Sequence, residues 1–239
     1  MHEVAQQPEI TIDKRHRRQL SLIPPIFYAT PATIIGCGAI GRQVALQLAS
    51  AGVLDLTLID ADIVTETNLS NQGYREKDID LYKVDVCCED IREINSQCQV
   101  HTKPEMLVDA TYSRMLANKI NFSTVFICVD SITARKNIYD LIKKQTQILI
   151  DGRMTAESMR IISIYQDTIE QRNKTYEDTL FTQEEAQSGP CTARSTIYCA
   201  NIAAGMMVSQ YTKILRGFQP EPDFCVNLLG NIIEILKWR

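Results

Sequence analysis

The sequence predicts an α/β fold whose doubly wound, mostly parallel sheet is extended by antiparallel strands in its C-terminal part. Short apolar runs alternate with helix-like segments, which is typical of such sheets. Several of these runs end in an aspartate, and a glycine-rich turn follows the first of them. Ligands of doubly wound sheets bind beyond the carboxyl ends of the strands, so we expect the site along that edge.

The first 151 residues supply the parallel part of the predicted sheet. Strands are expected at residues 33–35, 54–59, 125–129 and 147–150, and helices at 39–51, 89–95 and 136–144. Gly52 is placed to stop the first helix, because glycine readily adopts the left-handed conformation of a helix end. The last three strands are followed by Asp60, Asp130 and Asp151.

The remaining residues extend this sheet after a long interruption. The alternation at residues 159–165 predicts another strand, and the polar segment 166–190 is expected to be a long surface loop. A long helix rich in small and apolar residues, 192–216, and a closing hairpin of strands 224–229 and 232–238 follow. We expect residues 1–31 to form an N-terminal arm and connector, and residues 32–239 to form a single domain.

The composition excludes several classes of protein. The net charge of -4 and the sequence pI near 5.5 argue against a nucleic-acid partner, because binding to phosphates needs an excess of clustered Lys and Arg. No apolar stretch is long enough to cross a bilayer, so we expect no membrane partner. The eight cysteines have no repeated spacing. These features are typical of a cytoplasmic protein whose cysteines stay reduced.

The turn GCGAIG carries the first functional signal. Gly36, Gly38 and Gly41 have the spacing that allows a tight turn, close approach of the backbone to phosphate and close helix packing. The turn follows a strand and opens a helix, so a Rossmann-like nucleotide site is predicted. Asp60 follows the second strand, where an acid accepts hydrogen bonds from ribose hydroxyls. These residues alone favour a dinucleotide such as NAD.

The residues downstream change this interpretation to ATP. The stretch LIDADIVTETNLSNQGY, the later lysine and the segment VDSITAR resemble the ThiF, MoeB and ubiquitin-activating family. That family carries an acidic strand end, an Asn-Leu-x-Arg-Gln run, a lysine and an Asp-x-x-x-x-Arg segment. The matching positions are Asp60, Asp62, Val64, Asn68, Leu69, Gln72, Lys83, Asp130 and Arg135.

The resemblance implies an adenylyltransferase that uses ATP and Mg²⁺. A carboxylate attacks the α-phosphorus of ATP, and the site must stabilise charge on phosphate oxygens. Lys83 is expected to contact the phosphates and Asp130 to hold Mg²⁺, which prefers carboxylate oxygen. The nucleotide-binding residues implied are Gly36, Gly38, Gly41, Asp60, Asp62, Asn68, Gln72 and Lys83.

One position departs from the family pattern. Asn71 stands where the family has the arginine of Asn-Leu-x-Arg-Gln, and asparagine supplies no fixed charge. We expect Arg75 to compensate as a catalytic cation. The segment KRHRRQL resembles the family's Arg-x-x-Arg-Gln, which implies a homodimer in which Arg18, with Arg15 at the first arginine position, reaches the triphosphate of the other subunit.

The cysteines suggest a nucleophile but no metal. The chain lacks the two Cys-x-x-Cys pairs that hold structural zinc in many relatives, so we expect no zinc. Cys191, in the segment SGPCTAR, precedes the long helix, where a helix dipole and Arg194 would favour the thiolate. This segment is similar to the Cys-Thr run that carries the thioester-forming nucleophile of ubiquitin-activating enzymes. An inert cysteine is the alternative.

The leading hypothesis is ATP-dependent adenylation of the C-terminal glycine of a ubiquitin-like or sulfur-carrier protein, followed or not by a thioester on Cys191. A conjugating enzyme or a sulfur donor would be a further partner. The alternatives are a tRNA-modifying dehydratase of the same family and a catalytically impaired scaffold that binds the carrier. An NAD-dependent oxidoreductase is disfavoured, because no His, Tyr or Lys stands in an evident hydride-transfer arrangement.

Overall fold

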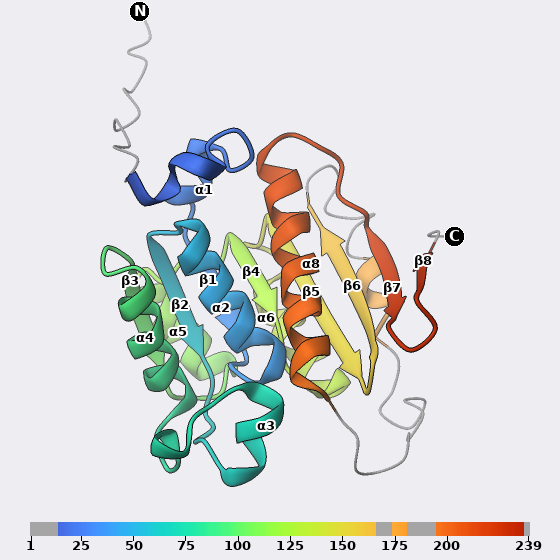
Figure 1. Ribbon diagram of the computed structural model, residues 1–239. Coiled ribbons are helices and arrows are strands. Elements are labelled where there is room, and N and C mark those ends of the chain that lie inside the picture. The colour runs from blue at the N-terminus through green and yellow to red at the C-terminus, as the bar shows by residue number, and fades with distance from the viewer. Residues whose placement is uncertain (1–13, 166–173, 181–194, 237–239) are drawn as a thin grey trace, which may run out of the picture.

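The computed structural model describes residues 14–165, 174–180 and 195–236, which form one eight-stranded sheet in the order β3-β2-β1-β4-β5-β6-β7-β8 (Figure 1). The first five strands in this order, β3, β2, β1, β4 and β5, are parallel, and β6, β7 and β8 pair antiparallel. The predicted fold class is therefore confirmed. The strands are β1 Ala32–Ile35, β2 Asp55–Ile59, β3 Gln99–Lys103, β4 Thr124–Ile127, β5 Ile148–Thr155, β6 Ser158–Ile164, β7 Asp223–Asn227 and β8 Ile232–Ile235.

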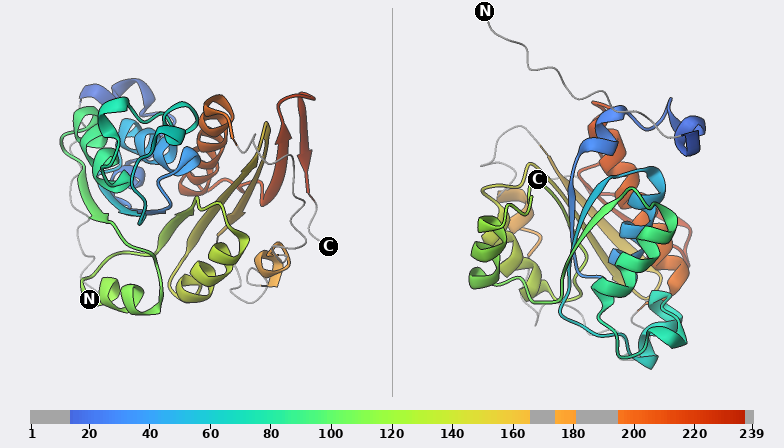
Figure 2. Two further views of the ribbon diagram at one scale, coloured as in Figure 1. Left: turned by 90° about the horizontal axis from the view of Figure 1, so that it is seen from below. Right: turned by 90° about the vertical axis from the view of Figure 1, so that its left-hand side faces the viewer.

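Helices cover both faces of the sheet (Figure 2). Helices α2, α4 and α8 lie on one face, and α5, α6 and residues 174–180 lie on the other. The bounds are α1 Pro25–Ala29, α2 Ala39–Ala51, α3 Leu69–Gln72, α4 Lys83–Ile94, α5 Asp109–Ala117, α6 Ile132–Ile142 and α8 Ile197–Leu215, with 3-10 helices η1 Lys14–Gln19, η2 Glu66–Asn68 and η3 Glu76–Asp78.

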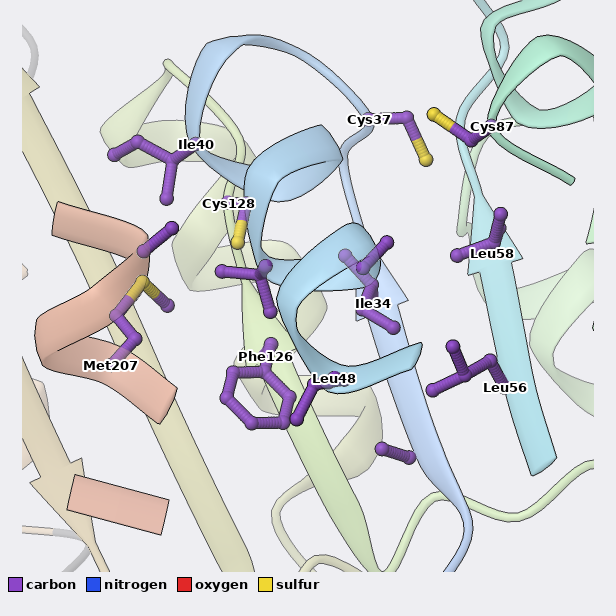
Figure 3. Packing of buried hydrophobic residues seen from close by; sticks show 14 of the residues in the cluster. Ile34, Cys37, Ile40, Leu48, Leu56, Leu58, Cys87, Phe126, Cys128 and Met207 are labelled. Atoms are coloured by element: carbon purple, nitrogen blue, oxygen red, sulfur yellow. The ribbon is translucent and has the colours of Figure 1, made fainter. Parts of the chain in front are cut away.

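Each face of the sheet has its own apolar core. The core under α2 and α8 includes Ile34, Leu48, Phe126 and Met207, which pack between these helices and the sheet (Figure 3). Tyr211 of α8 joins this core to α1, because its ring centroid lies 5.2 Å from that of Phe27. The expected connector before β1 thus contributes buried aromatic side chains to the core.

The observed bounds agree closely with the prediction for α2 and less closely for β5. Helix α2 ends at Gly52, which has a φ of +112° as expected of a helix stop. Strand β5, however, continues to Thr155 rather than ending at residue 150. Asp151 is therefore wholly buried inside the strand, and the prediction that it marks a strand end is wrong.

Some elements carry little sequence signal. Strand β3 was not predicted, because its residues QVHTK are polar and partly exposed at the sheet edge. Helix α5 was also missed, and α4 begins at Lys83, six residues before the predicted helix. The closing hairpin of β7 and β8 is confirmed, and α8 lies within the predicted helix 192–216, whose first three residues are outside the described part.

The two edges of the sheet differ in character. Strand β3 presents Gln99, His101 and Lys103. At the other edge, all four residues of β8 are exposed, and Ile233 is 65% exposed. No helix within the described residues is both long and apolar enough to cross a membrane.

Candidate active site

The glycine loop connects β1 to α2 at the carboxyl edge of the sheet. Gly36 has a φ of +92°, which disfavours any other residue, and Gly38 is the N-cap of α2. A Cβ atom on Gly41 would lie 1.7 Å from the carbonyl oxygen of Gly36. The loop therefore requires glycine at positions 36 and 41, and it leaves the first amides of α2 open to an anion.

Asp60 fixes this loop from the end of β2. Its Oδ2 atom accepts a hydrogen bond of 2.6 Å from the backbone amide of Cys37, and its Oδ1 atom accepts one of 2.8 Å from the amide of Asp62. Burial raises the pKa of the Asp60 carboxyl, and the two amides and Lys83 oppose that shift. Its carboxylate thus lies between the loop and the segment that follows β2.

Asp62 and Lys83 form an ion pair beside Asp60. The Lys83 Nζ atom lies 2.9 Å from Asp62 Oδ2, and the amide of Lys83 donates to the carbonyl of Asp62. The Lys83 side chain is 6% exposed, whereas that of Asp62 is 67% exposed. Lys83 begins α4, so the pair places an ammonium group and an open carboxylate at the edge where the loop lies.

Tyr74 closes the loop from the other side, and this residue was not predicted. Its hydroxyl donates to the carbonyl of Cys37 at 2.6 Å and lies 3.4 Å from the Sγ atom of Cys87 on α4. Burial raises the pKa of Tyr74, so the hydroxyl stays protonated as a donor. A tyrosine two residues after Gln72 carries no motif, because its contact with the loop exists only in the folded chain.

Gln72, the last residue of α3, and Asn68, the last residue of η2, lie differently relative to the glycine loop. The Oε1 atom of Gln72 would lie 3.8 Å from a Cβ atom on Gly38, and it is buried with no hydrogen-bond partner among the described residues. Asn68 instead caps η2, where its Oδ1 atom accepts from the amide of Thr65 at 3.0 Å. Gln72 therefore lies at the loop, whereas the side chain of Asn68 makes a local contact.

A carboxylate shared by two arginines lies between α2 and α4. Asp90 accepts from Arg42 at 2.6 Å and from Arg75 at 2.5 Å, and its side chain is 5% exposed. Arg42 also lies over the Tyr74 ring, 5.0 Å from its centroid. Arg75 is held by this pair, with its side chain 46% exposed. Its compensating role stays a prediction.

Asp130 and Arg135 have separate roles in the structure. Asp130 is exposed just beyond β4, the strand next to β1, and so lies on the edge that carries the glycine loop. Arg135 is buried and pairs with Asp151, and its Nη2 atom donates to the carbonyls of Val129 and Gly152. Arg135 therefore braces the segment that carries Asp130.

Other predicted residues lie elsewhere. Arg18 is exposed in η1. Arg15 and Gln19 of η1 form hydrogen bonds with Asn95 and Ala51, at the C-terminal ends of α4 and α2, which lie at the amino ends of the parallel strands. Arg18 thus lies away from the glycine loop of its own chain. Cys191 and Arg194 lie outside the described residues. Asn71 donates a 3.2 Å hydrogen bond to the hydroxyl of Ser195, next to the start of α8.

A metal would need additional ligands at this site. No group of three His, Cys, Asp or Glu side chains that could hold a metal ion occurs in residues 14–165, 174–180 and 195–236. Mg²⁺ commonly binds through one or two carboxylates together with phosphates of a substrate. The exposed carboxylate of Asp130 fits that mode of binding.

Comparisons with known proteins identify the family of this chain. Residues 29–234 match the ThiF family. The chain belongs to the ThiF family. The tRNA threonylcarbamoyladenosine dehydratase of Escherichia coli K12 is 31% identical over 100 residues, 41% of this chain and 37% of that protein. The adenylyltransferase and sulfurtransferase MOCS3 of Dictyostelium discoideum is 32% identical over 120 residues, 50% of this chain and 28% of that protein. The matches thus span well under half of these ThiF-family relatives.

Solved structures share the ThiF-family fold of this chain. PaaA superposes with a TM-score of 0.73 at 20% identity, covering 99% of this chain and 78% of that one. Escherichia coli MccB with ATP superposes with a TM-score of 0.68 at 17% identity, covering 90% of this chain and 67% of that one. At these identities the likeness concerns the fold.

Proposed function

We propose that this chain uses ATP to adenylate the C-terminal glycine carboxylate of a ubiquitin-like or sulfur-carrier protein. The observation that carries the proposal is the arrangement of Asp60, Asp62 and Lys83 around the glycine loop, in a chain of the ThiF family. Relatives named adenylyltransferase and sulfurtransferase support the reaction class.

The proposed chemistry assigns a task to each group. The amides at the start of α2 and the ammonium group of Lys83 bind phosphate oxygens, on which negative charge accumulates. Asp60 and Asp62 accept hydrogen bonds from the ribose hydroxyls. The carboxylate oxygen of the carrier then forms a bond to the α-phosphorus while the bond to pyrophosphate breaks, which leaves an acyl adenylate. Mg²⁺ held by Asp130 would neutralise charge on the phosphates.

Three further features belong to the same proposal. Cys191 would take the adenylated carboxylate as a thioester, with AMP as the leaving group. Arg18 would serve the site of a second subunit, which requires a homodimer, because it lies at the opposite edge of its own chain. A conjugating enzyme or a sulfur donor would then receive the activated carrier in the cytoplasm.

An ATP–pyrophosphate exchange assay tests the proposal. The probes are purified small proteins that end in Gly-Gly, each compared with a version that lacks the last glycine. Exchange that depends on the last glycine is the expected result, and Lys83→Ala should reduce it while Lys136→Ala, an exposed lysine on α6, should not. ATP binding without exchange for every carrier would contradict the proposal and favour a scaffold, which Asn71 keeps as an alternative.

The match to the tRNA threonylcarbamoyladenosine dehydratase favours one other function, adenylation of a carboxylate on a modified tRNA base. The acidic pI counts against it, because RNA binding needs a basic face. Replacing the carrier by total tRNA in the exchange assay distinguishes the two: exchange with tRNA alone would assign this second function.

The role of Cys191 has its own test. A reductant-sensitive carrier adduct that persists in Cys191→Ala would exclude Cys191 as the nucleophile.

A further inference from the structure

Two thiols meet directly beneath the glycine loop. Cys37, the second residue of the loop, and Cys87, on α4, are both wholly buried and both free. Their side chains lie beside one another (Figure 3), and each thiol shifts the pKa of the other. The Tyr74 hydroxyl touches both residues, because it bonds to the Cys37 carbonyl at 2.6 Å and lies 3.4 Å from Cys87 Sγ. Two residues 50 positions apart are thus held in one contact.

We propose that Cys37 and Cys87 form a reversible disulfide that links the glycine loop to α4 and displaces the loop. The crosslink itself is independent of the reaction proposed above, whereas its effect on ATP binding rests on that function. The bond would make this edge of the sheet a site of oxidative modification, with a peroxide as the oxidant.

The surroundings of the pair decide which sulfur reacts first. Contact with Cys37 lowers the pKa of Cys87, as do the Tyr74 hydroxyl and the charge of Arg42, whereas burial raises it. The same contact raises the pKa of Cys37, and burial raises it further. Since the thiolate is the nucleophile, Cys87 is the sulfur that attacks the oxidant.

The oxidation is balanced in two steps. The Cys87 thiolate attacks one oxygen of hydrogen peroxide, which breaks the O–O bond and, with one proton, gives a sulfenic acid and water. The sulfur of Cys37 then attacks the sulfenic sulfur, and its proton leaves with the hydroxide as a second water. Two thiols lose two electrons and two protons in total, and the peroxide is reduced to two waters.

The crosslink would change the loop because the backbone of Cys37 is already held by two hydrogen bonds. A disulfide needs a separation of about 2.05 Å between the sulfur atoms, which is much shorter than a thiol–thiol hydrogen bond. Drawing the Cys37 side chain toward α4 strains two hydrogen bonds. One runs from the Cys37 backbone amide to Asp60, and the other from the Tyr74 hydroxyl to the Cys37 carbonyl. Gly36, with its φ of +92°, and Gly38 on either side allow the backbone to move.

Peroxide treatment of the full chain followed by peptide mapping tests the proposal. Free thiols are blocked with an alkylating agent, and the protein is digested without reductant. We expect one crosslinked peptide pair that contains Cys37 and Cys87 and that disappears after dithiothreitol. Amide hydrogen exchange over residues 36–42 should become faster in the oxidised protein, and ATP affinity measured by calorimetry should fall about tenfold or more and recover on reduction.

Matched variants identify the responsible sulfur. Cys87→Ala should abolish the crosslink and the change in hydrogen exchange, whereas Cys98→Ala should retain both. Tyr74→Phe keeps the ring but removes the hydroxyl that contacts both the Cys37 carbonyl and Cys87 Sγ, so crosslinking should become several-fold slower. This variant still tests the pair should Cys87→Ala fail to fold.

Several results would overturn the proposal. It is wrong if the mapped bond joins Cys37 to Cys128 or Cys87 to Cys88, if no bond forms in wild-type protein, or if the bond forms while hydrogen exchange in the loop is unchanged. Failure of the reduced protein to bind ATP would instead contradict the proposed function, and the mapping and exchange results would still decide the crosslink.

Discussion

Asp60 at the loop edge and Asp151 in the interior of β5 are carboxylates of the same sheet, but their surroundings differ. Asp60 accepts from two backbone amides and stays partly open. Asp151 is wholly buried between two arginines, with Arg153 Nε at 2.7 Å, and accepts from the Tyr176 hydroxyl at 3.0 Å.

This difference separates binding from stability. Backbone amides fix the position of Asp60 without neutralising it, so its charge remains available to a ligand. The two arginines that neutralise Asp151 come from β5 and α6, and they tie these elements to residues 174–180. We therefore expect substitutions at Asp151 to affect folding and substitutions at Asp60 to affect the nucleotide.

The largest effect is expected for Asp151→Asn. Removing the charge leaves two buried arginines without their partner, and breaking such a pair costs about 3–5 kcal/mol of unfolding free energy. Urea denaturation followed by circular dichroism measures it. Asp140→Asn on α6, whose carboxylate is itself exposed and pairs with the exposed Lys136 and the half-buried Lys143, is the matched control and should cost about 1 kcal/mol or less. Equal losses in the two variants would contradict the contrast.

Asp60→Asn should instead weaken nucleotide binding. Charge-assisted hydrogen bonds to the ribose contribute about 1.5–3 kcal/mol, so ATP affinity should fall roughly tenfold or more, while the loss of one amide acceptor should lower stability by about 1 kcal/mol, less than in Asp151→Asn. Calorimetric titration with ATP gives the affinity. Asp55→Asn, at the other end of β2, is the control and should bind ATP normally. Unchanged affinity in Asp60→Asn would exclude the ribose contact.

A pH titration sharpens the same point. Burial raises the pKa of Asp60 in the folded chain, although Lys83 opposes and Asp62 adds to the shift. The ionised form is therefore relatively costly when folded, and this cost disappears as the pH falls through the raised pKa. ATP affinity should decrease over that same interval, above the range of an ordinary aspartate. In Asp60→Asn the decrease should be absent, and its persistence would assign it to another group.

The smallest effect on stability is expected for Arg75→Ala. Half of this side chain is in solvent, and Asp90 keeps its pair with Arg42, so the loss should be about 1 kcal/mol or less. Exchange activity then decides the role of Arg75. A large fall in kcat with little loss of stability would support compensation for Asn71, whereas normal kcat would leave Arg75 as a surface partner of Asp90.

The sequence predicted the parts of the site that lie in one local motif. Gly36, Gly38, Gly41 and Asp60 were found because a strand, a glycine turn and a helix follow each other directly. Asp151 was misplaced, since an aspartate after an apolar run looks the same whether the strand ends there or continues. Only its arginine partners, 16 and 2 residues away, show that the carboxylate is inside.

Contacts between distant segments could not be predicted in this way. Tyr74, Cys87, Arg42 and Asp90 lie on α2, on α4 and in the segment before η3, and they meet only because α4 packs against α2. The polar strand β3 was not predicted for a related reason. It forms through backbone hydrogen bonds with its parallel neighbour β2, and its own residues show no strand pattern.

Strand β8 determines how this protein will behave at high concentration. Within the described residues, its outer edge pairs with no strand, and Ile232, Ile233 and Ile235 are all more than half exposed. An apolar edge with unpaired backbone groups is a template for self-association, whereas the lysine and histidine of β3 discourage it at the other end. Of the two sheet edges in the described residues, β8 is therefore where we expect self-association, so a charged residue in place of Ile233 is the change to try first for crystallisation.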